Sequence, residues 1–228
     1  MRQIEYSIYF ACKRKPLHWA RIEELQLQPH GYYLTNSDYH LLPTGAALPF
    51  APWVHELEAL STIPLTRHAA RIDIGIGTEF MVSEFTMPVP AQLVQLFATA
   101  GVGLSLTLMP HFNRQTRYRG MSYNVLAADT LPRKPARHLP AAITRHLHSM
   151  SLHPHYQNSN FTRLVAHPLP PGSTVAVCRY IARGGWISLD LPPIFMRRVA
   201  AQQSALLLHI NLPQSHGEKI VTPLHSAL

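Results

Sequence analysis

The sequence has little cysteine, little charge and no long apolar run, and each shortage excludes a class of protein. Its 228 residues include only two cysteines, Cys12 and Cys178, which are too few for a disulfide framework and lack the paired spacing of a zinc site. No apolar run reaches the roughly 18 residues of a membrane-spanning helix, and the first residues lack the apolar core of a signal peptide. We therefore expect a cytoplasmic protein that does not enter a membrane.

The sequence does contain enough apolar residues for a folded core. Hydrophobic residues make up 46% of the chain and charged residues only 14%, which is unlike the polar composition of a disordered protein. A chain of 228 residues can form one large domain or two small ones, so length alone leaves both possibilities open.

Charge is distributed unevenly between the two halves of the chain. Residues 1–110 contain seven Lys/Arg and nine Asp/Glu, whereas residues 111–228 contain thirteen and three. Eleven of the thirteen basic residues are arginine, whose planar guanidinium suits bidentate contact with phosphate or carboxylate. This asymmetry predicts a polyanion such as RNA, or an acidic protein surface, as the partner of the second half.

Hydrophobic periodicity predicts a similar order of strands and helices in each half. In the first half it favours helices at 17–27 and 87–100, the second followed by Gly101, and strands at 4–10, 32–42, 70–77 and 102–110. In the second half it favours helices at 138–150 and 191–204 and strands at 121–127, 161–167, 173–186 and 205–213. A Pro-rich insertion with Trp53 and a short helix, at about 43–60, occurs only in the first half.

The last helix and strand of the two halves align without a gap at an offset of 104 residues. This alignment places Pro88 on Pro192 and Leu104 on Leu208, and it keeps the alternation of apolar residues in the strand. A one-residue slip would turn every buried side chain outward, so the shared parity indicates a tandem duplication.

Each predicted half fits the ferredoxin-like order β-α-β-β-α-β, in which two helices cover an antiparallel sheet. We therefore predict an α+β fold of two tandem ferredoxin-like domains. The first would span residues 1–110 with its Pro-rich insertion. The second, basic domain would span 111–228 and end in a short tail.

Three stretches of the first half carry a resemblance to a known family: "YSIYF", "ARIEELQLQPHGYY", and the block from "IDIGIGTEF" to "PAQLVQLFATAGVGLSLTLM". They resemble a bacterial family of small α+β domains, domain of unknown function 4279. The second half matches it through "SYNVLA", "LPAAITRHLHSMSLHP" and "LPPIFMRRVAAQQSALLLHINLP". The family's acidic stretch after the first strand is here "ACKRKPLHW". The resemblance implies a small α+β fold and a place among bacterial interaction and toxin-immunity proteins.

The sequence lacks the common motifs of catalytic sites and of metal-binding sites. The sequence contains no G-x-G-x-x-G after a strand, no phosphate-binding G-x-x-x-x-G-K-[ST], and no G-x-S-x-G, H-E-x-x-H or C-x-x-C. Histidines gather at His138, His146, His148, His153 and His155, but the nearest acid in the sequence is Asp129. We interpret these histidines as solvated positions on a basic helix face, and we expect no metal and no cofactor.

The predicted binding residues lie on two helices of the second half: Arg137, Arg145, His148, Arg197 and Arg198. In the first of these helices, apolar residues form one stripe and basic residues lie outside it. In the second, the offset of 104 puts Arg197 and Arg198 where the first half has Leu93 and Val94. We expect this divergence to have left one structural copy and one charged copy.

These observations favour a non-enzymatic, immunity-like protein that engages an acidic partner through its basic second half. The alternative is an RNA-binding protein or an endoribonuclease of the kind that processes CRISPR repeats, since those enzymes also use tandem ferredoxin-like domains. In that alternative, His18 beside three basic residues would act as a metal-independent general acid or base. The Gly-rich loop of those enzymes is here "AAQQSALLL", which counts against it. A structural subunit that uses Trp19, Trp53 and Trp186 as contact residues is a third possibility.

Overall fold

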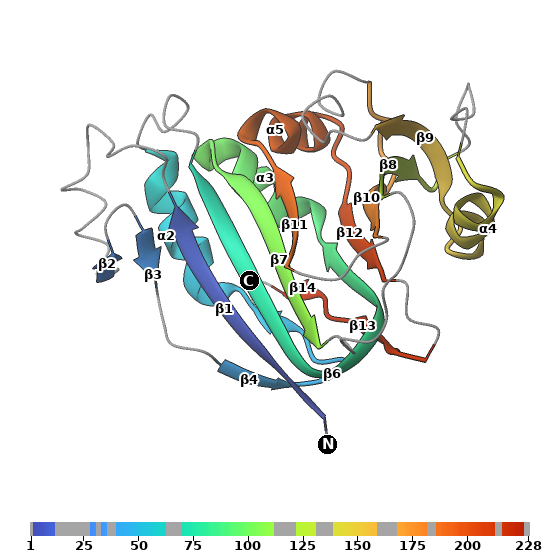
Figure 1. Ribbon diagram of the computed structural model, residues 1–228. Helices are drawn as coiled ribbons and strands as arrows, with labels where there is room; N and C mark the ends of the chain where they lie inside the picture. Colours follow the sequence, from blue (N-terminus) through green and yellow to red (C-terminus); the bar gives the residue numbers. More distant parts are fainter. Residues whose placement is uncertain are drawn as a thin grey trace.

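The computed structural model describes residues 2–11, 28–30, 33–35, 40–62, 70–111, 122–130, 139–158, 168–181, 186–212 and 216–225. Over these residues the chain is a mixed α+β protein, with helices packed on a large and mostly antiparallel sheet (Figure 1). The predicted connection at 109–122 lies mostly outside them, as do His18 and Arg137.

In the first half, one strand is central to the sheet. β1 (Gln3–Ala11) alternates inward residues such as Ile4 and Ile8 with outward ones, as a strand with one buried face requires. It pairs antiparallel with β3 (Tyr33–Thr35), β4 (His40–Pro43) and the beginning of β6 (Arg71–Val89). β2 (Gln28–His30) extends the edge beyond β3, and β7 (Gly103–His111) lies parallel to β6 on the other side.

The second half repeats this arrangement. β8 (Tyr123–Ala128) is central and pairs antiparallel with β9 (His153–Asn158) and β10 (Val175–Tyr180), and β12 (Leu206–Asn211) lies parallel to β10. The strands of each half therefore follow the order second, first, third, fourth. The shared order supports the predicted duplication.

This order does not confirm the ferredoxin-like arrangement. In the split β-α-β unit of that fold, another strand separates the two parallel strands that a helix connects. Here β6 and β7, connected by α3 (Ala91–Ala100), are direct neighbours, and so are β10 and β12, which are connected through β11 (Ile187–Leu191) and α5 (Pro193–Ala201). Helices α3, α4 and α5 lie where helices were predicted, whereas the predicted helix at 17–27 and strand at 161–167 lie outside the described residues. The order of the described strands differs from the prediction.

The two halves also exchange strands. β6 continues to Val89, well past its pairing with β1, and residues 84–89 pair antiparallel with β12 of the second half. In return, β11 of the second half pairs antiparallel with β7 of the first. We call the pairing of 104–108 with 187–191 the first seam, and the pairing of 206–211 with 84–89 the second seam.

The helices next to the seams give the true offset between the repeats, which is 102 residues. The amides of Gly101 and Gln203, both with positive φ, bond the carbonyls of Ala98 and Ala200 at the two helix ends. At this offset three of the four buried residues of each helix coincide: Leu93, Val94 and Phe97 of α3 with Phe195, Met196 and Val199 of α5. At the same offset, the first-seam pair Leu104 and Leu191 is equivalent to the second-seam pair Leu206 and Val89.

The predicted offset of 104 is therefore wrong by two residues. Apolar residues alternate with period two, so a two-residue shift keeps the parity and leaves no trace in the pattern. Arg197 and Arg198 are equivalent to Gln95 and Leu96, and both members of each pair have the same degree of exposure. They do not replace the buried Leu93 and Val94.

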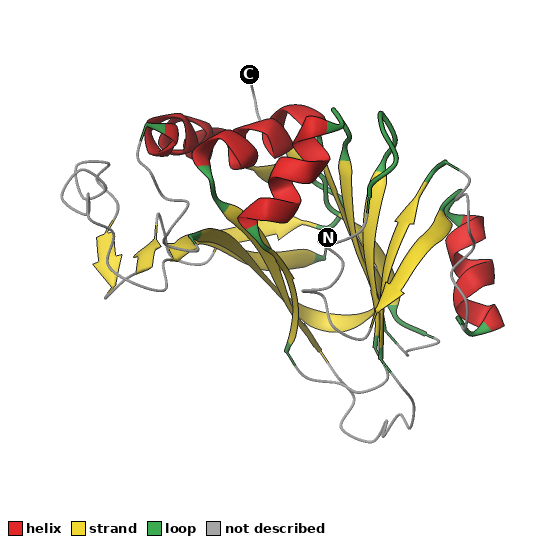
Figure 2. Cartoon of the chain, turned by 90° about the horizontal axis from the view of Figure 1, so that it is seen from above, coloured by secondary structure: helices red, strands yellow, loops and turns green. Residues whose placement is uncertain are grey.

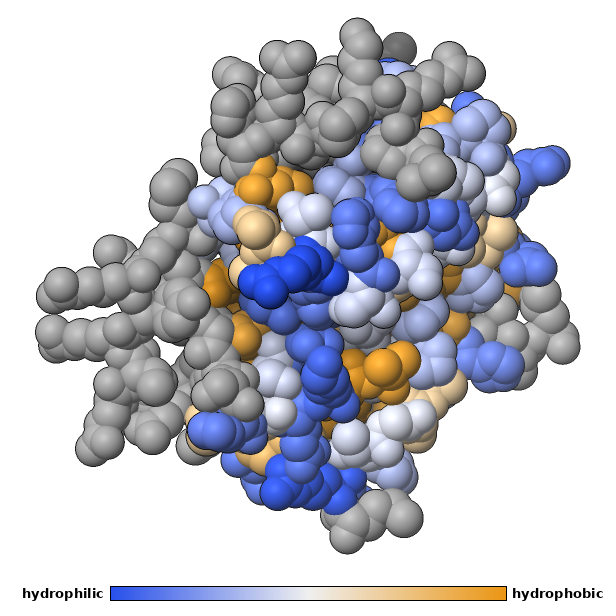
Figure 3. All heavy atoms as spheres, turned by 90° about the vertical axis from the view of Figure 1, so that its right-hand side faces the viewer, coloured by the Kyte–Doolittle hydropathy of each residue, from blue (hydrophilic) through white to orange (hydrophobic). Residues whose placement is uncertain are grey.

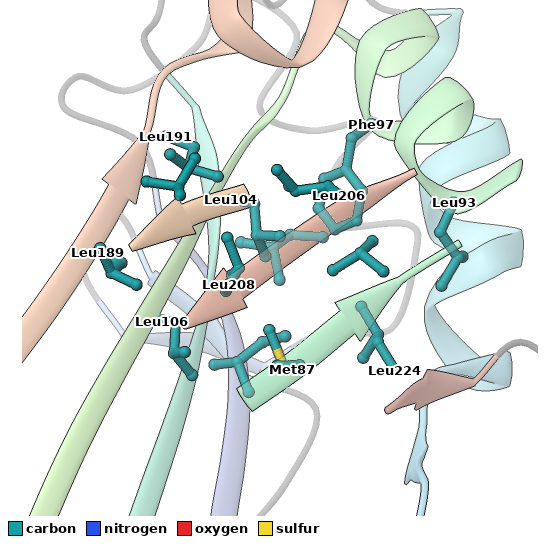
Figure 4. Packing of buried hydrophobic residues seen from close by; sticks show 14 of the residues in the cluster. Met87, Leu93, Phe97, Leu104, Leu106, Leu189, Leu191, Leu206, Leu208 and Leu224 are labelled. Carbon is teal, nitrogen blue, oxygen red and sulfur yellow. The ribbon is translucent and has the colours of Figure 1, made fainter. Parts of the chain in front are cut away.

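One hydrophobic cluster spans both halves. Figure 4 shows leucines of β7, β11 and β12 converging with Met87 of β6 and Phe97 of α3. The predicted insertion belongs to this cluster, since Trp53 of α2 (Ala51–Ser61) is fully buried in it. β5 (Leu48–Pro49) precedes α2 and pairs with β14 (Leu224–His225), so the predicted tail is also part of the fold. The two predicted domains thus share a core.

A second, smaller cluster lies on the other face of the second-half strands. α4 (Ala141–Ser149) packs Ile143 and Leu147 there, against Val125 and Cys178. Figure 2 shows the other three described helices grouped together and α4 apart from them, beyond the strands of the second half. α4 therefore covers a face of the sheet that the common core does not use.

Candidate functional site

A cluster of polar side chains lies at the second seam, between the sheet and α4. Alternation along β12 turns Leu206 and Leu208 into the common core and His209 toward α4. His209 Nδ1 lies 2.9 Å from Thr86 Oγ1 across the seam. The ring of His146 on α4 lies 5.1 Å from the His209 ring, between ring centroids.

His146 links this seam to the neighbouring strands. Its Nδ1 lies 3.1 Å from the hydroxyl of Tyr180, and its Nε2 lies 3.4 Å from a carboxylate oxygen of Glu84. Lys219, on β13 (Glu218–Val221), places its Nζ 2.7 Å from the same oxygen. Five ionisable groups, Glu84, His146, Tyr180, His209 and Lys219, therefore form one network.

Burial controls the protonation of this network. His209 is fully buried and its Nε2 contacts no hydrogen-bond partner among the described residues. Burial, with a smaller effect of His146, lowers the pKa of His209 to about 4, and burial also raises the pKa of Tyr180. Burial alone would raise the pKa of Glu84, but the hydrogen bond from Lys219 and the nearby positive charges lower it. The network is therefore built around an ionised Glu84, a neutral His209 and a protonated Tyr180.

The first seam contains a different set of polar residues. The Ser105 hydroxyl donates to Asp190 at 2.6 Å, and Arg71 contacts both Asp73 and Asp190. Asp73 is buried, and burial raises its pKa against the opposing effects of Arg71 and Ser105. At the offset of 102, the pair Thr107 and Ser188 of this seam is the counterpart of His209 and Thr86. The two repeats therefore have polar side chains at equivalent positions of the seams, but the residue types at these positions differ.

The two seams also differ in what borders their outer edge. β13 pairs parallel with β6, and just beyond it the Thr222 amide donates to the Thr86 carbonyl at 2.9 Å. The equivalent carbonyl of the other repeat belongs to Ser188 on β11, and it accepts a hydrogen bond from the Arg179 guanidinium. β11 pairs with β7 alone in the described part of the chain. The Ser188 carbonyl therefore accepts a hydrogen bond from a side chain, whereas the equivalent Thr86 carbonyl accepts one from a backbone amide.

Large apolar side chains are exposed near the two ends of β11. Trp186 directly precedes β11 and is 81% exposed, and Ile194, in the first turn of α5, is 49% exposed. Arg197 follows three residues after Ile194, so the two lie on one face of the helix, and Arg197 is also exposed. We call Trp186, Ile194 and Arg197, together with β11, the β11–α5 surface.

The predicted binding residues do not come together in one place. Arg145 and His148 are exposed on α4, whereas Arg197 is exposed and Arg198 half-buried on α5. Figure 1 places these two helices in separate parts of the molecule. The side of the molecule on which α4 lies has mostly hydrophilic described atoms, with apolar residues in separate patches (Figure 3). Sequence reasoning missed the seam residues because they come from strands far apart in the chain.

The histidine-rich stretch continues from α4 into β9. The rings of His148 and His153 lie 5.2 Å apart, and His155 Nε2 lies 2.7 Å from the Pro168 carbonyl oxygen. In the described ranges, no three His, Cys, Asp or Glu residues are grouped so that they could hold a metal ion. Residues 153–158 form β9, a strand that the sequence pattern did not predict.

Comparisons with protein-family models, curated proteins and solved structures found no match to this chain. The resemblance to domain of unknown function 4279 therefore stays a prediction. Within the described residues, no helix is both long enough and apolar enough to cross a membrane.

Proposed function

We propose that this chain is a non-enzymatic, immunity-like binding protein that engages an acidic protein partner through its second half. The observation that carries the proposal is the β11–α5 surface, where Trp186 is 81% exposed beside a strand with an unpaired edge among the described residues. Exposed tryptophan and arginine side chains are typical anchors of protein interfaces. Ile194 and Arg197 extend this surface onto α5.

Charge supports an acidic partner. The second half contains thirteen Lys/Arg and three Asp/Glu, and such a surface attracts acidic proteins over long range. Arg145 and His148 form a second basic face on α4, away from α5. We assign contact with the partner to the β11–α5 surface, because it combines charge with exposed apolar area.

RNA is the second candidate ligand, and one observation favours it. Lys219, with an exposed side chain, and the half-buried His146 contact the same carboxylate, Glu84. Histidine and lysine are among the side chains that can act as general acid or base in metal-independent cleavage of RNA. His18, the general acid or base predicted for this activity, lies outside the described residues.

A capture experiment separates the two candidates. The full-length chain is immobilised and incubated with lysate of the source cell, with and without nuclease, at low and high salt. We expect an acidic protein to be captured from the nuclease-treated lysate and to be lost with Trp186→Ala/Arg197→Glu. The control variant, Arg145→Glu/His148→Glu on α4, should retain capture. Capture of nucleic acid that falls steeply with salt would instead support RNA. Loss of capture only in the α4 variant would contradict the assignment to β11 and α5.

A further inference from the structure

We propose that the outer edge of β11 receives an extended, acidic segment of the partner protein as an added parallel strand. This inference rests on the proposed function and specifies how the partner is recognised. Its basis is the strand that the same molecule already places on the equivalent edge of the other repeat.

The equivalent edge belongs to β6 at the second seam. There β13 runs parallel to β6 and aligns Lys219 with Glu84, Ile220 with Phe85 and Val221 with Thr86. At the offset of 102, the three β6 positions correspond to Trp186, Ile187 and Ser188. An added strand in the same register would therefore lie along the beginning of β11, beside the exposed Trp186.

The backbone of β11 is oriented to receive such a strand. The Ser188 carbonyl accepts its bond from Arg179 and so points away from β7. The amide and carbonyl of one residue in an antiparallel strand point to the same side, so the Ser188 amide also faces outward. Extended peptides bind unpaired edges of this kind through main-chain hydrogen bonds, while side-chain pockets supply the specificity.

Arg179 gives the reason that the added strand would be acidic. Its guanidinium is half-buried, and its Nε has no hydrogen-bond partner in the described part of the structure. Burial lowers the pKa of Arg179, and the nearby Asp190 only partly offsets this effect. A strand amide that takes over the Ser188 carbonyl would release Nη1, and a carboxylate of the incoming segment would then bond both guanidinium nitrogens.

The β13 strand indicates the side-chain pattern of the segment. Ile220, aligned with Phe85, is buried, whereas its neighbours Lys219 and Val221 are exposed. The equivalent residue of the incoming strand would lie opposite Ile187 and should be aliphatic. Its neighbours would face solvent and Arg179, where aspartate or glutamate is favoured. The predicted ligand is thus an extended segment that alternates acidic and aliphatic residues.

The test uses the full chain and a synthetic peptide that alternates Asp or Glu with Val, followed through the change in tryptophan fluorescence, to which the exposed Trp186 contributes. A peptide with Asn and Gln in place of the acids is the charge control. We expect the acidic peptide to bind at least about tenfold more tightly than the neutral one, and Arg179→Met to remove this preference.

Ser188→Pro tests the strand geometry, because it removes an outward amide and leaves the bonds to β7 in place. We expect about tenfold weaker peptide binding for Ser188→Pro and unchanged binding for Ser188→Ala. Equal binding by both variants overturns the inference. An absence of peptide binding, together with a much lower unfolding midpoint for Ser188→Pro, also overturns the inference. That result would mean that another part of the chain already pairs with the outer edge of β11. A partner captured equally by wild type and Ser188→Pro leaves the proposed function standing and refutes only the added strand.

Discussion

The buried His209 makes a quantitative prediction about stability and pH. Its pKa is about 4 in the folded protein, against an ordinary value of 6.5. The unfolded chain therefore takes up a proton as the pH falls through 6.5, while the folded protein does not do so until about 4. The unfolded state binds more protons over this range, so the free energy of unfolding must decrease as the pH decreases.

The size of the effect follows from the pKa difference. One pKa unit corresponds to about 1.4 kcal/mol, so a fall from 6.5 to about 4 gives a maximum loss of about 3 kcal/mol. Between pH 7 and pH 5, the expected loss from His209 is about 2 kcal/mol. His209→Gln retains a polar side chain next to Thr86 but takes up no proton, so this variant should lack that part of the pH dependence.

Urea unfolding of both proteins, followed by circular dichroism at pH 7, 6 and 5, measures this difference. The lower starting stability of the variant cancels, because only the change with pH is compared. Asp73 and Glu84 also have shifted pKa values, but both proteins contain them, and His209 is only the smallest cause of the shift of Glu84, so most of their effect cancels as well. If wild type and His209→Gln lose the same free energy between pH 7 and pH 5, then His209 is not buried as a neutral ring.

Three further predictions concern the strand exchange and the offset between repeats. Leu208→Ala should lower the free energy of unfolding by about 3 kcal/mol, measured in urea, because this side chain is fully buried at the second seam. Segments 1–110 and 111–228 expressed separately should lack the cooperative unfolding transition of the whole chain, measured by calorimetry, since each leaves half of the common core exposed. Gly101→Ala should destabilise by about 1 kcal/mol and Gln203→Gly should stabilise by a few tenths, both measured by thermal unfolding, because both positions have positive φ.

Local pattern was enough to predict most of the regular elements. Alternating Ile72, Ile74 and Ile76 predicted the start of β6, and the spacing of apolar residues predicted α3, α4 and α5. Gly101, predicted to follow the end of a helix, has the left-handed conformation expected there. These features depend on residues that are close together in the sequence, which is why the pattern reveals them.

The strand exchange was missed because it joins distant segments. Phe85, Met87 and Val89 alternate toward the core, and so do Ile187, Leu189 and Leu191, yet both stretches were left without a strand assignment. Each follows another strand of its own repeat, and nothing local shows that its partner lies in the other repeat. The alternation was the available signal, and a search for it at the beginning of the two predicted helices would have found it.

The candidate site was less predictable than the fold. Arg197 was chosen because an offset of 104 placed it over a buried leucine, but at the true offset it is equivalent to the exposed Gln95. Its exposure was predicted correctly and for the wrong reason. The network around His209 combines side chains from four strands and one helix, and only the three-dimensional packing brings them together.

Comparison of the two repeats indicates where they have diverged. Three of the four buried residues of α3 and α5 coincide, and the seams share one register, so the core is subject to the same packing constraint in both repeats. Their outer edges differ: a strand completes β6, while Arg179 and the exposed Trp186 border β11. An unpaired edge exposes the protein to unwanted association, and a charged side chain placed on it limits that risk. Arg179 meets this requirement in the free protein, and an acidic strand is the partner that would displace it from the Ser188 carbonyl. Among the described residues, β11 lacks the added strand that completes β6, and this difference is the basis on which we propose binding at β11.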